Sequence, residues 1–131
     1  MILSFLYNKF HMKLRESSQN KYIPKDTYMK IVDFLKDYTE KDIIIVCIGT
    51  NRTNLVDCLG PFVGSILKED KEFNIPVYGS MVNPIHGLNL TEKITKIKNN
   101  YPNSTIIAVD AAIGECEDIG EITISNLTSA K

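Results

Sequence analysis

The sequence lacks an excess of charge of either sign, because 15 lysine and arginine residues face 16 aspartate and glutamate residues. A duplex-DNA binder needs a basic face, so this balance argues against nucleic acid as a partner. The sequence also lacks any apolar run that approaches the roughly 18 residues of a membrane-spanning helix. We therefore expect neither nucleic acid nor a membrane as a partner.

Cysteine is also scarce. The three cysteines, Cys47, Cys58 and Cys116, form an odd set without CxxC spacing. Their number and spacing do not favour a disulfide framework or a zinc site. The short apolar segment Met1–Tyr7 comes before its basic neighbours, which is the wrong order for a secretory signal. We expect a cytoplasmic protein in which residues 1–25 form an N-terminal arm or docking segment.

What the sequence does contain is an alternation of apolar patterns. Unbroken apolar runs predict buried strands, and apolar residues spaced three and four apart predict helices. The predicted elements are a helix capped by Asp26, strand Ile43–Ile48, helix Leu59–Leu67, strand Ile75–Tyr78, helix Leu90–Tyr101, strand Thr105–Val109 and strand Gly120–Ile124. Strands that alternate with helices predict a single α/β domain over residues 1–131, with a mostly parallel sheet in a three-layer α/β/α sandwich. Gly60 and Gly64 would let their helix approach the sheet closely.

Two acids stand at the expected carboxyl edge of this sheet. Asp57 follows strand Ile43–Ile48 through a loop, and Asp110 comes directly after strand Thr105–Val109. If the strands are neighbours, the two carboxylates lie at one edge, where one acid could stay protonated while the other acts as a base. Such a pair could activate water for amide hydrolysis. The alternative is that Asp57 caps the following helix and Asp110 caps a turn.

The loop after the first buried strand, Gly49–Asn54, offers backbone and side-chain hydrogen-bond donors, including Thr50, Asn51 and Arg52. It lacks the GK[ST] ending of a P-loop and does not fit GxGxxG. Arg52 could contact a substrate carboxylate, or it could form an ion pair with Asp57. These residues are candidates for substrate binding, and phosphate binding stays an alternative.

His86 follows a predicted strand, in the loop Asn83–Gly87. A histidine at a sheet edge could bind a substrate or carry a proton. Alternatively, it could hold its own loop through hydrogen bonds. A metal site formed by Asp57, Asp110 and His86 is only weakly indicated by three ligands in three loops. Among the cysteines, Cys47 is predicted to lie in the core.

Four segments in order resemble the YyaC family, which is assigned to spore proteases of endospore-forming bacteria. The segments are Cys47–Thr53, Asp57–Gly64, Asn83–Leu90 and Ile107–Ala111. That family is similar to the germination protease, which degrades small acid-soluble spore proteins, and to hydrogenase-maturation endopeptidases. The resemblance implies a phosphorylase/hydrolase-like three-layer fold.

The resemblance also implies roles for the two acids. Asp57, in Asp57-Cys58-Leu59-Gly60-Pro61, and Asp110, in Val109-Asp110-Ala111, match the catalytic acids proposed for the germination protease. The metal-binding histidine of the maturation endopeptidases lies after their acid pair, whereas His86 precedes Asp110. The resemblance therefore implies no metal and no cofactor.

The chain departs from the family pattern in several places. Asn51 stands where relatives carry aspartate, and Cys58 stands where a smaller residue is usual. Asn54-Leu55-Val56 replaces a more glycine-rich approach to Asp57. Relatives also continue beyond the equivalent of Lys131, so we expect the C-terminal part of the family domain to be missing.

The first hypothesis is a sporulation-associated, endopeptidase-like hydrolase of the aspartic type, in the cytoplasm of the sporulating cell or forespore. Its substrate would be a protein or peptide. The alternative hypothesis is a non-catalytic binding or assembly protein that keeps the protease-like fold. If the short C-terminus leaves a sheet face exposed, a homodimer would be favoured.

Overall fold

The computed structural model describes residues 25–38, 42–52, 56–111, 116–118 and 122. These residues fall into two compact units. One contains residues 25–37, 116–118 and 122, and the other contains the rest. The predicted single domain over residues 1–131 stays a prediction. The predicted arm over residues 1–25 and most of the last predicted strand, Gly120–Ile124, lie outside the described residues.

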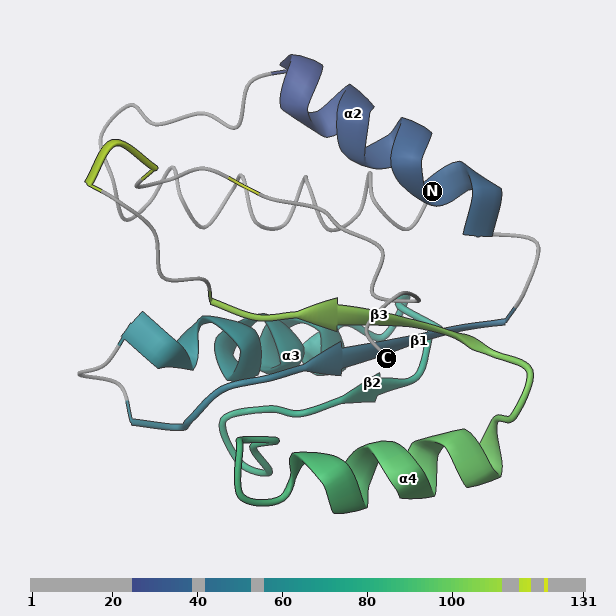
Figure 1. The fold of residues 1–131 in the computed structure, drawn as a ribbon, viewed down its shortest axis with the longest axis vertical. Coiled ribbons are helices and arrows are strands. Elements are labelled where there is room, and N and C mark those ends of the chain that lie inside the picture. The colour runs from purple at the N-terminus through teal and green to yellow at the C-terminus, as the bar shows by residue number, and fades with distance from the viewer. Residues whose placement is uncertain (1–24, 39–41, 53–55, 112–115, 119–121, 123–131) are drawn as a thin grey trace. The chain divides into compact units, whose positions relative to one another are not determined.

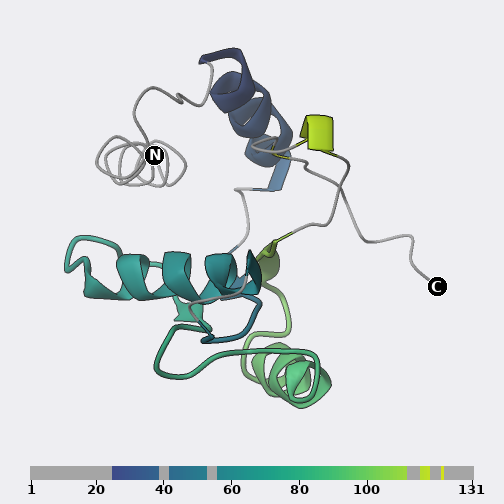
Figure 2. The same cartoon turned by 90° about the vertical axis from the view of Figure 1, so that its left-hand side faces the viewer.

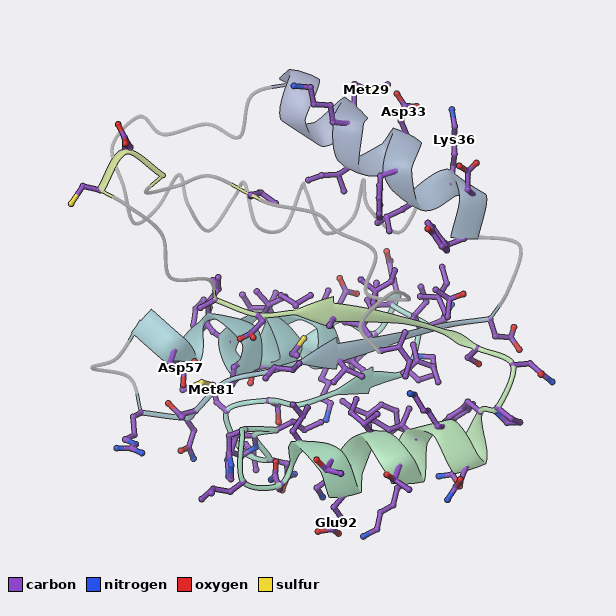
Figure 3. The ribbon with its side chains drawn as sticks, in the orientation of Figure 1. Met29, Asp33, Lys36, Asp57, Met81 and Glu92 are labelled. Atoms are coloured by element: carbon purple, nitrogen blue, oxygen red, sulfur yellow. The ribbon has the colours of Figure 1, made fainter. Side chains whose placement is uncertain are left out.

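The smaller unit contains helix α2, Lys25–Leu35, and the short 3₁₀ turn η3, Cys116–Asp118. Asp26, predicted to precede its helix as a cap, instead lies in the first turn of α2. A second 3₁₀ turn, η1, covers Lys36–Tyr38, and Lys36 forms an exposed ion pair of 3.2 Å with Asp33 (Figure 3).

The larger unit is built on a parallel sheet whose strands have the order β2-β1-β3 (Figure 1). Strand β1 is Ile43–Cys47, β2 is Val77–Tyr78 and β3 is Thr105–Val109. The predicted neighbours β1 and β3 pair along their whole length, from Ile43 with Thr105 to Cys47 with Val109. The prediction of a parallel α/β fold is therefore confirmed for this unit.

The strand β2 is shorter than the predicted Ile75–Tyr78. The carbonyl oxygen of Pro76 still accepts a 2.9 Å hydrogen bond from Ile45. Because proline has no N–H to donate, it is a poor member of a strand ladder. The chain then leaves the sheet and returns at Ile85, which forms a parallel bridge with Ile48. Two separate segments therefore flank the same side of β1.

Helix α3, Leu59–Glu69, packs against β1 and β2. Gly60 and Gly64 are buried on it, and a side chain at either position would collide with backbone: Ile48 O at Gly60 and Gly79 O at Gly64. The predicted close approach of this helix to the sheet is confirmed. The helix extends two residues beyond the predicted Leu67.

Helix α4, Leu90–Asn100, lies on the opposite side of the sheet from α3 (Figures 1 and 2). Its buried Ile97 joins Ile44, Val46 and Ile85 in a core cluster. Alternate residues of β1 therefore serve the two faces: Ile44 and Val46 meet α4, while Cys47 meets α3 at Gly64. This two-sided cover explains why the sequence of β1 shows no alternation. None of the helices in the described part of the chain has the length and apolar character needed to cross a lipid bilayer.

Candidate functional site

The end of β1 is the meeting point of three chain segments. Ile48 N–H donates to Val109 O at 2.8 Å, and Gly49 N–H donates to Ile85 O at 2.7 Å. Gly49 has a φ of 151°, and a side chain there would collide with the carbonyl oxygen of Asp57. Glycine is therefore required at the point where the chain leaves the sheet.

Asp57 lies in the 3₁₀ turn η2, Val56–Cys58, directly before α3. Its side chain is exposed at the edge of the sheet where the strands end (Figure 3). The residue that caps α3 is Cys58, and no side chain caps this helix through a hydrogen bond. The alternative interpretation of Asp57 as a helix cap is therefore wrong.

The carboxylate of Asp57 forms no hydrogen bond or ion pair with any residue that the structure describes. The alternative ion pair between Arg52 and Asp57, both described residues, is consequently absent. What fixes Asp57 is its backbone, because its carbonyl oxygen accepts a 3.0 Å hydrogen bond from Thr50 N–H. The sheet thus positions the acid without neutralising it.

Asp110 comes directly after β3 and is an exposed residue whose carboxyl group is partly covered. Burial raises the pKa of its carboxyl group above the ordinary 3.8, the Ala111 N–H opposes this, and the negative charge of Asp57 raises the pKa further. The negative charge of Asp57 therefore acts on Asp110 across the sheet edge. A carboxyl group that holds its proton more firmly beside a second carboxylate has the character required of an acid–base pair.

The loop after β1 holds the three predicted substrate-binding residues. Thr50 is partly buried, whereas Asn51 and Arg52 are exposed. Asn51 Nδ2 donates to Met81 O at 3.4 Å, which links this loop to the segment after β2. The Thr50 hydroxyl oxygen is buried, and within the described ranges it has no hydrogen-bond partner. A buried hydroxyl without a partner lowers the stability of the fold by about 1–3 kcal/mol. An apolar residue of the same shape at position 50 would therefore give a more stable fold.

His86 lies on the other side of β1 from Asp110, next to Ile85. Its Nδ1 accepts a 3.3 Å hydrogen bond from Leu88 N–H, and its backbone N–H donates to Asn89 Oδ1 at 2.9 Å. The alternative that His86 holds its own loop is thus confirmed as a structural role. Val109 and Ile85 contact β1 from its two sides, and because β-strands are spaced about 4.8 Å apart, these two segments lie about 10 Å apart.

A metal site formed by Asp57, Asp110 and His86 was only weakly indicated by the sequence. Over the residues that the structure describes, no three His, Cys, Asp or Glu side chains are grouped so that they could hold a metal ion. Asp57, Asp110 and His86 therefore share one sheet edge without forming such a group.

Cys47 is buried in β1, as predicted. Burial raises the pKa of its thiol to about 12, although the charge of Lys68 opposes this effect. Cys58 is half-buried and Cys116 is exposed. All three cysteines are free thiols.

Asn89 is the residue at this edge that the sequence interpretation missed. Its side chain accepts from His86 N–H and donates from Nδ2 to Pro84 O at 3.1 Å. Its position before the helix that begins at Leu90 could have drawn attention to it, since asparagine is a favoured helix cap. Its side chain in fact bonds backwards into the loop and does not cap α4.

Taken together, these features define an α/β protein with two interacting carboxyl groups at the carboxyl edge of a small parallel sheet. The family described as "Protein of unknown function (DUF1256)" matches residues 19–130. The chain belongs to this family.

The chain is also similar to the "Uncharacterized protein YyaC" of Bacillus subtilis (strain 168). The two are 38% identical over 92 residues, which is 70% of this chain and 44% of that protein. The predicted resemblance to the YyaC family is confirmed. The chain spans less than half the length of this curated relative. No solved structure matches the chain.

Proposed function

We propose that this chain is an endopeptidase-like hydrolase that cleaves a protein segment with Asp57 and Asp110. The observation that supports this most directly is the raised pKa of Asp110, to which both burial and the charge of Asp57 contribute. A carboxyl group whose pKa is raised beside a second carboxylate is suited to the role of general acid, which leaves Asp57 as the proposed base.

In this mechanism the ionised carboxylate of Asp57 removes a proton from a water molecule as the water oxygen adds to the peptide carbonyl carbon. The protonated Asp110 donates its proton to the leaving nitrogen, and the C–N bond breaks. Water thus supplies the hydroxyl of the new carboxylic acid. Asp57 now holds the proton taken from water, and transfer of this proton to Asp110 restores the starting state of the pair. Thr50, Asn51, Arg52 and His86 would line the substrate path around the two acids.

We further propose that the complete domain is a three-layer α/β/α sandwich of the phosphorylase/hydrolase type. The placement of α3 and α4 on opposite faces of the sheet supports this extension. A role in sporulation, in the cytoplasm of the sporulating cell or the forespore, is part of the same proposal. It rests on the likeness to the germination protease.

The test is cleavage of fluorescein-labelled, unfolded casein by the full chain and by the variants Asp57→Asn and Asp110→Asn. We expect each substitution to reduce turnover by at least about a hundredfold, the lower range for loss of an acid–base group. The matched control is Asp42→Asn, because Asp42 is an exposed acid just before β1, at the opposite edge of the sheet. Turnover that is unchanged in both site variants would exclude the carboxylate pair.

The second candidate is a non-catalytic binding or assembly protein. It is favoured by two large apolar side chains near the same edge, Val82 and Leu88, which are 83% and 98% exposed. Large apolar side chains exposed on a surface can mark protein contacts. A chain that binds unfolded casein without cleaving it, with equal affinity in wild type and the Asp57→Asn/Asp110→Asn double variant, would favour this alternative.

A further inference from the structure

We propose that the turn from Pro84 to Asn89 is a subsite for an extended polypeptide backbone, in which Asn89 holds His86 as an Nε2–H donor to a substrate carbonyl oxygen. This inference rests on the proposed function, because it names the class of substrate for the same sheet edge. His86 is then a binding residue and Asn89 a positioning residue.

The turn is fixed by its own hydrogen bonds. The side chain of Asn89 accepts from His86 N–H at 2.9 Å and donates to Pro84 O at 3.1 Å. The N–H groups of Asn89 and Leu90 both donate to His86 O, at 3.0 and 2.9 Å. The amides of Asn89 and Leu90, at the start of α4, are therefore occupied within the turn.

These bonds do not use the second ring nitrogen of His86. Because Leu88 N–H donates to His86 Nδ1, that nitrogen carries the lone pair, and the neutral ring carries its proton on Nε2. Within the described part of the chain, no group accepts a hydrogen bond from Nε2. The turn thus presents a hydrogen-bond donor whose orientation is already set.

There is room for a ligand in front of this turn. A side chain built at Gly87 would meet no atom within 4 Å, and the neighbouring Leu88 is 98% exposed. The turn thus places a hydrogen-bond donor, His86 Nε2–H, near an exposed apolar side chain, Leu88. A polypeptide suits this combination, because it offers both backbone carbonyl oxygens and apolar side chains. An anionic ligand would instead call for a cation at this turn.

The spacing between the segments on the two sides of β1 gives the length of peptide that would reach from one to the other. Val109, directly before Asp110, and Ile85, directly before His86, lie on either side of β1, so their backbones are about 10 Å, or two strand spacings, apart. An extended chain advances about 3.3 Å per residue, so this distance corresponds to about three residues. A peptide laid across the strand ends is therefore long enough to contact both segments.

Binding is measured by fluorescence anisotropy of fluorescein-labelled, unfolded casein on the Asp57→Asn/Asp110→Asn double variant, which would not cleave it. Added His86→Ala should weaken binding about tenfold, the effect of one hydrogen bond of about 1.4 kcal/mol. Added His86→Gln should stay within about threefold of the parent, because its amide can place a donor near Nε2. Added Asn89→Ala should weaken binding as His86→Ala does, and Glu92→Gln on the outer face of α4 should have no effect.

The tautomer provides a readout that depends on neither binding nor cleavage. Long-range ¹H–¹⁵N correlation spectra of the histidine-labelled full chain should show His86 as the Nε2–H form, with assignment by His86→Gln. A spectrum that shows the Nδ1–H form of His86 would overturn the subsite. Equal casein binding by the parent double variant and by its His86→Ala and Asn89→Ala derivatives would overturn it as well. Casein cleavage that requires Asp57 and Asp110 while binding ignores His86 would overturn this inference alone. His86-dependent binding without carboxylate-dependent cleavage would overturn only the proposed mechanism.

Discussion

The backbone N–H of Thr50 donates a 3.0 Å hydrogen bond to the backbone carbonyl oxygen of Asp57. This bond joins the end of β1 to the turn before α3 and closes the loop between them. Asp57 is therefore held at the sheet edge by main-chain geometry, although its side chain is exposed. A substitution of the Asp57 side chain should consequently change the charge at this edge and leave the local backbone in place.

Asp110 should titrate above the ordinary aspartate value of 3.8, and Asp57→Asn should lower its pKa because one cause of the increase is the charge of Asp57. The measurement is a carboxyl ¹³C titration of the wild type and the variant. Asp42→Asn, at the opposite sheet edge, should leave the Asp110 titration unchanged. An Asp110 pKa that is identical with and without the Asp57 charge would contradict the interaction.

The raised pKa of Asp110 also predicts how the stability of the wild type depends on pH, and how it compares with that of the Asp110→Asn variant. A raised pKa means that the folded state binds the proton more tightly, so the wild type loses stability as the pH rises from 3.8 through the folded pKa. At neutral pH the charged Asp110 is unfavourable, and Asp110→Asn should melt at the same or a slightly higher temperature. The effect is small because the group is partly exposed. A variant that melts much lower than the wild type at pH 7 would show that the charged form stabilises the fold.

Replacing Thr50 by valine should not reduce stability. The hydroxyl oxygen of Thr50 is buried without a partner in the described residues, and valine keeps a similar shape without it. We expect a gain of up to about 1 kcal/mol in the free energy of unfolding, from removal of an unsatisfied polar group. Chemical denaturation with urea measures it, with Thr95→Val on α4 as the control because the Thr95 hydroxyl has a partner at 2.8 Å. A loss of more than about 1 kcal/mol at Thr50 would reveal a hydrogen bond to that hydroxyl.

Alanine at Gly64 should destabilise the protein. In the interior of an exposed helix, the change from glycine to alanine normally stabilises by about 1 kcal/mol. Here the added methyl group would collide with the carbonyl oxygen of Gly79, which is backbone and cannot turn aside. We expect the free energy of unfolding to fall by at least about 2 kcal/mol, in the range of overpacked cores.

Gly87→Ala is the matched control for that experiment, because a side chain there meets nothing within 4 Å. Its free energy of unfolding should remain within about 0.5 kcal/mol of the wild type, as for most surface changes. Equal effects at Gly64 and Gly87 would mean that α3 does not lie as close to the sheet as described.

Cys47 should resist thiol reagents in the folded protein. Its thiol is buried, and its pKa is raised to about 12, so little thiolate forms at pH 8. Labelling with a chromogenic disulfide reagent should be fastest at the exposed Cys116, slower at the half-buried Cys58 and absent at Cys47. All three should react in guanidinium chloride. Rapid labelling of Cys47 under native conditions would show that β1 opens readily.

The sequence carried much of the information about the sheet. Strand β1 could be predicted because an apolar run covered on both faces needs no alternation, and β3 has the same character at its centre. Gly60 and Gly64 could be recognised because a helix that lies close to a sheet has no room for side chains at the contact. Asp57 and Asp110 could be associated because parallel strands bring their ends to one edge.

Other features of the fold and the site could not be predicted from the sequence, and the reasons are again physical. Ile85 pairs with Ile48 as a single residue, and one residue has no periodicity. The role of Asn89 depends on hydrogen bonds to Pro84 and His86, whose geometry exists only once the turn has formed. The position of Asp57 before the cap residue of α3, and not at it, depended on a 3₁₀ turn that has no clear signal in the sequence.

The split partner of β1 also bears on how this protein could change over time. Val77–Tyr78 and Ile85 are each held by β1, so the six residues between them begin and end at fixed points of the sheet. Within this segment Asn83 and Ser80 close a turn through two hydrogen bonds, and Val82 between them is exposed. Changes confined to the exposed side chains of this segment should therefore leave the strands, and the acids at the sheet edge, where they are.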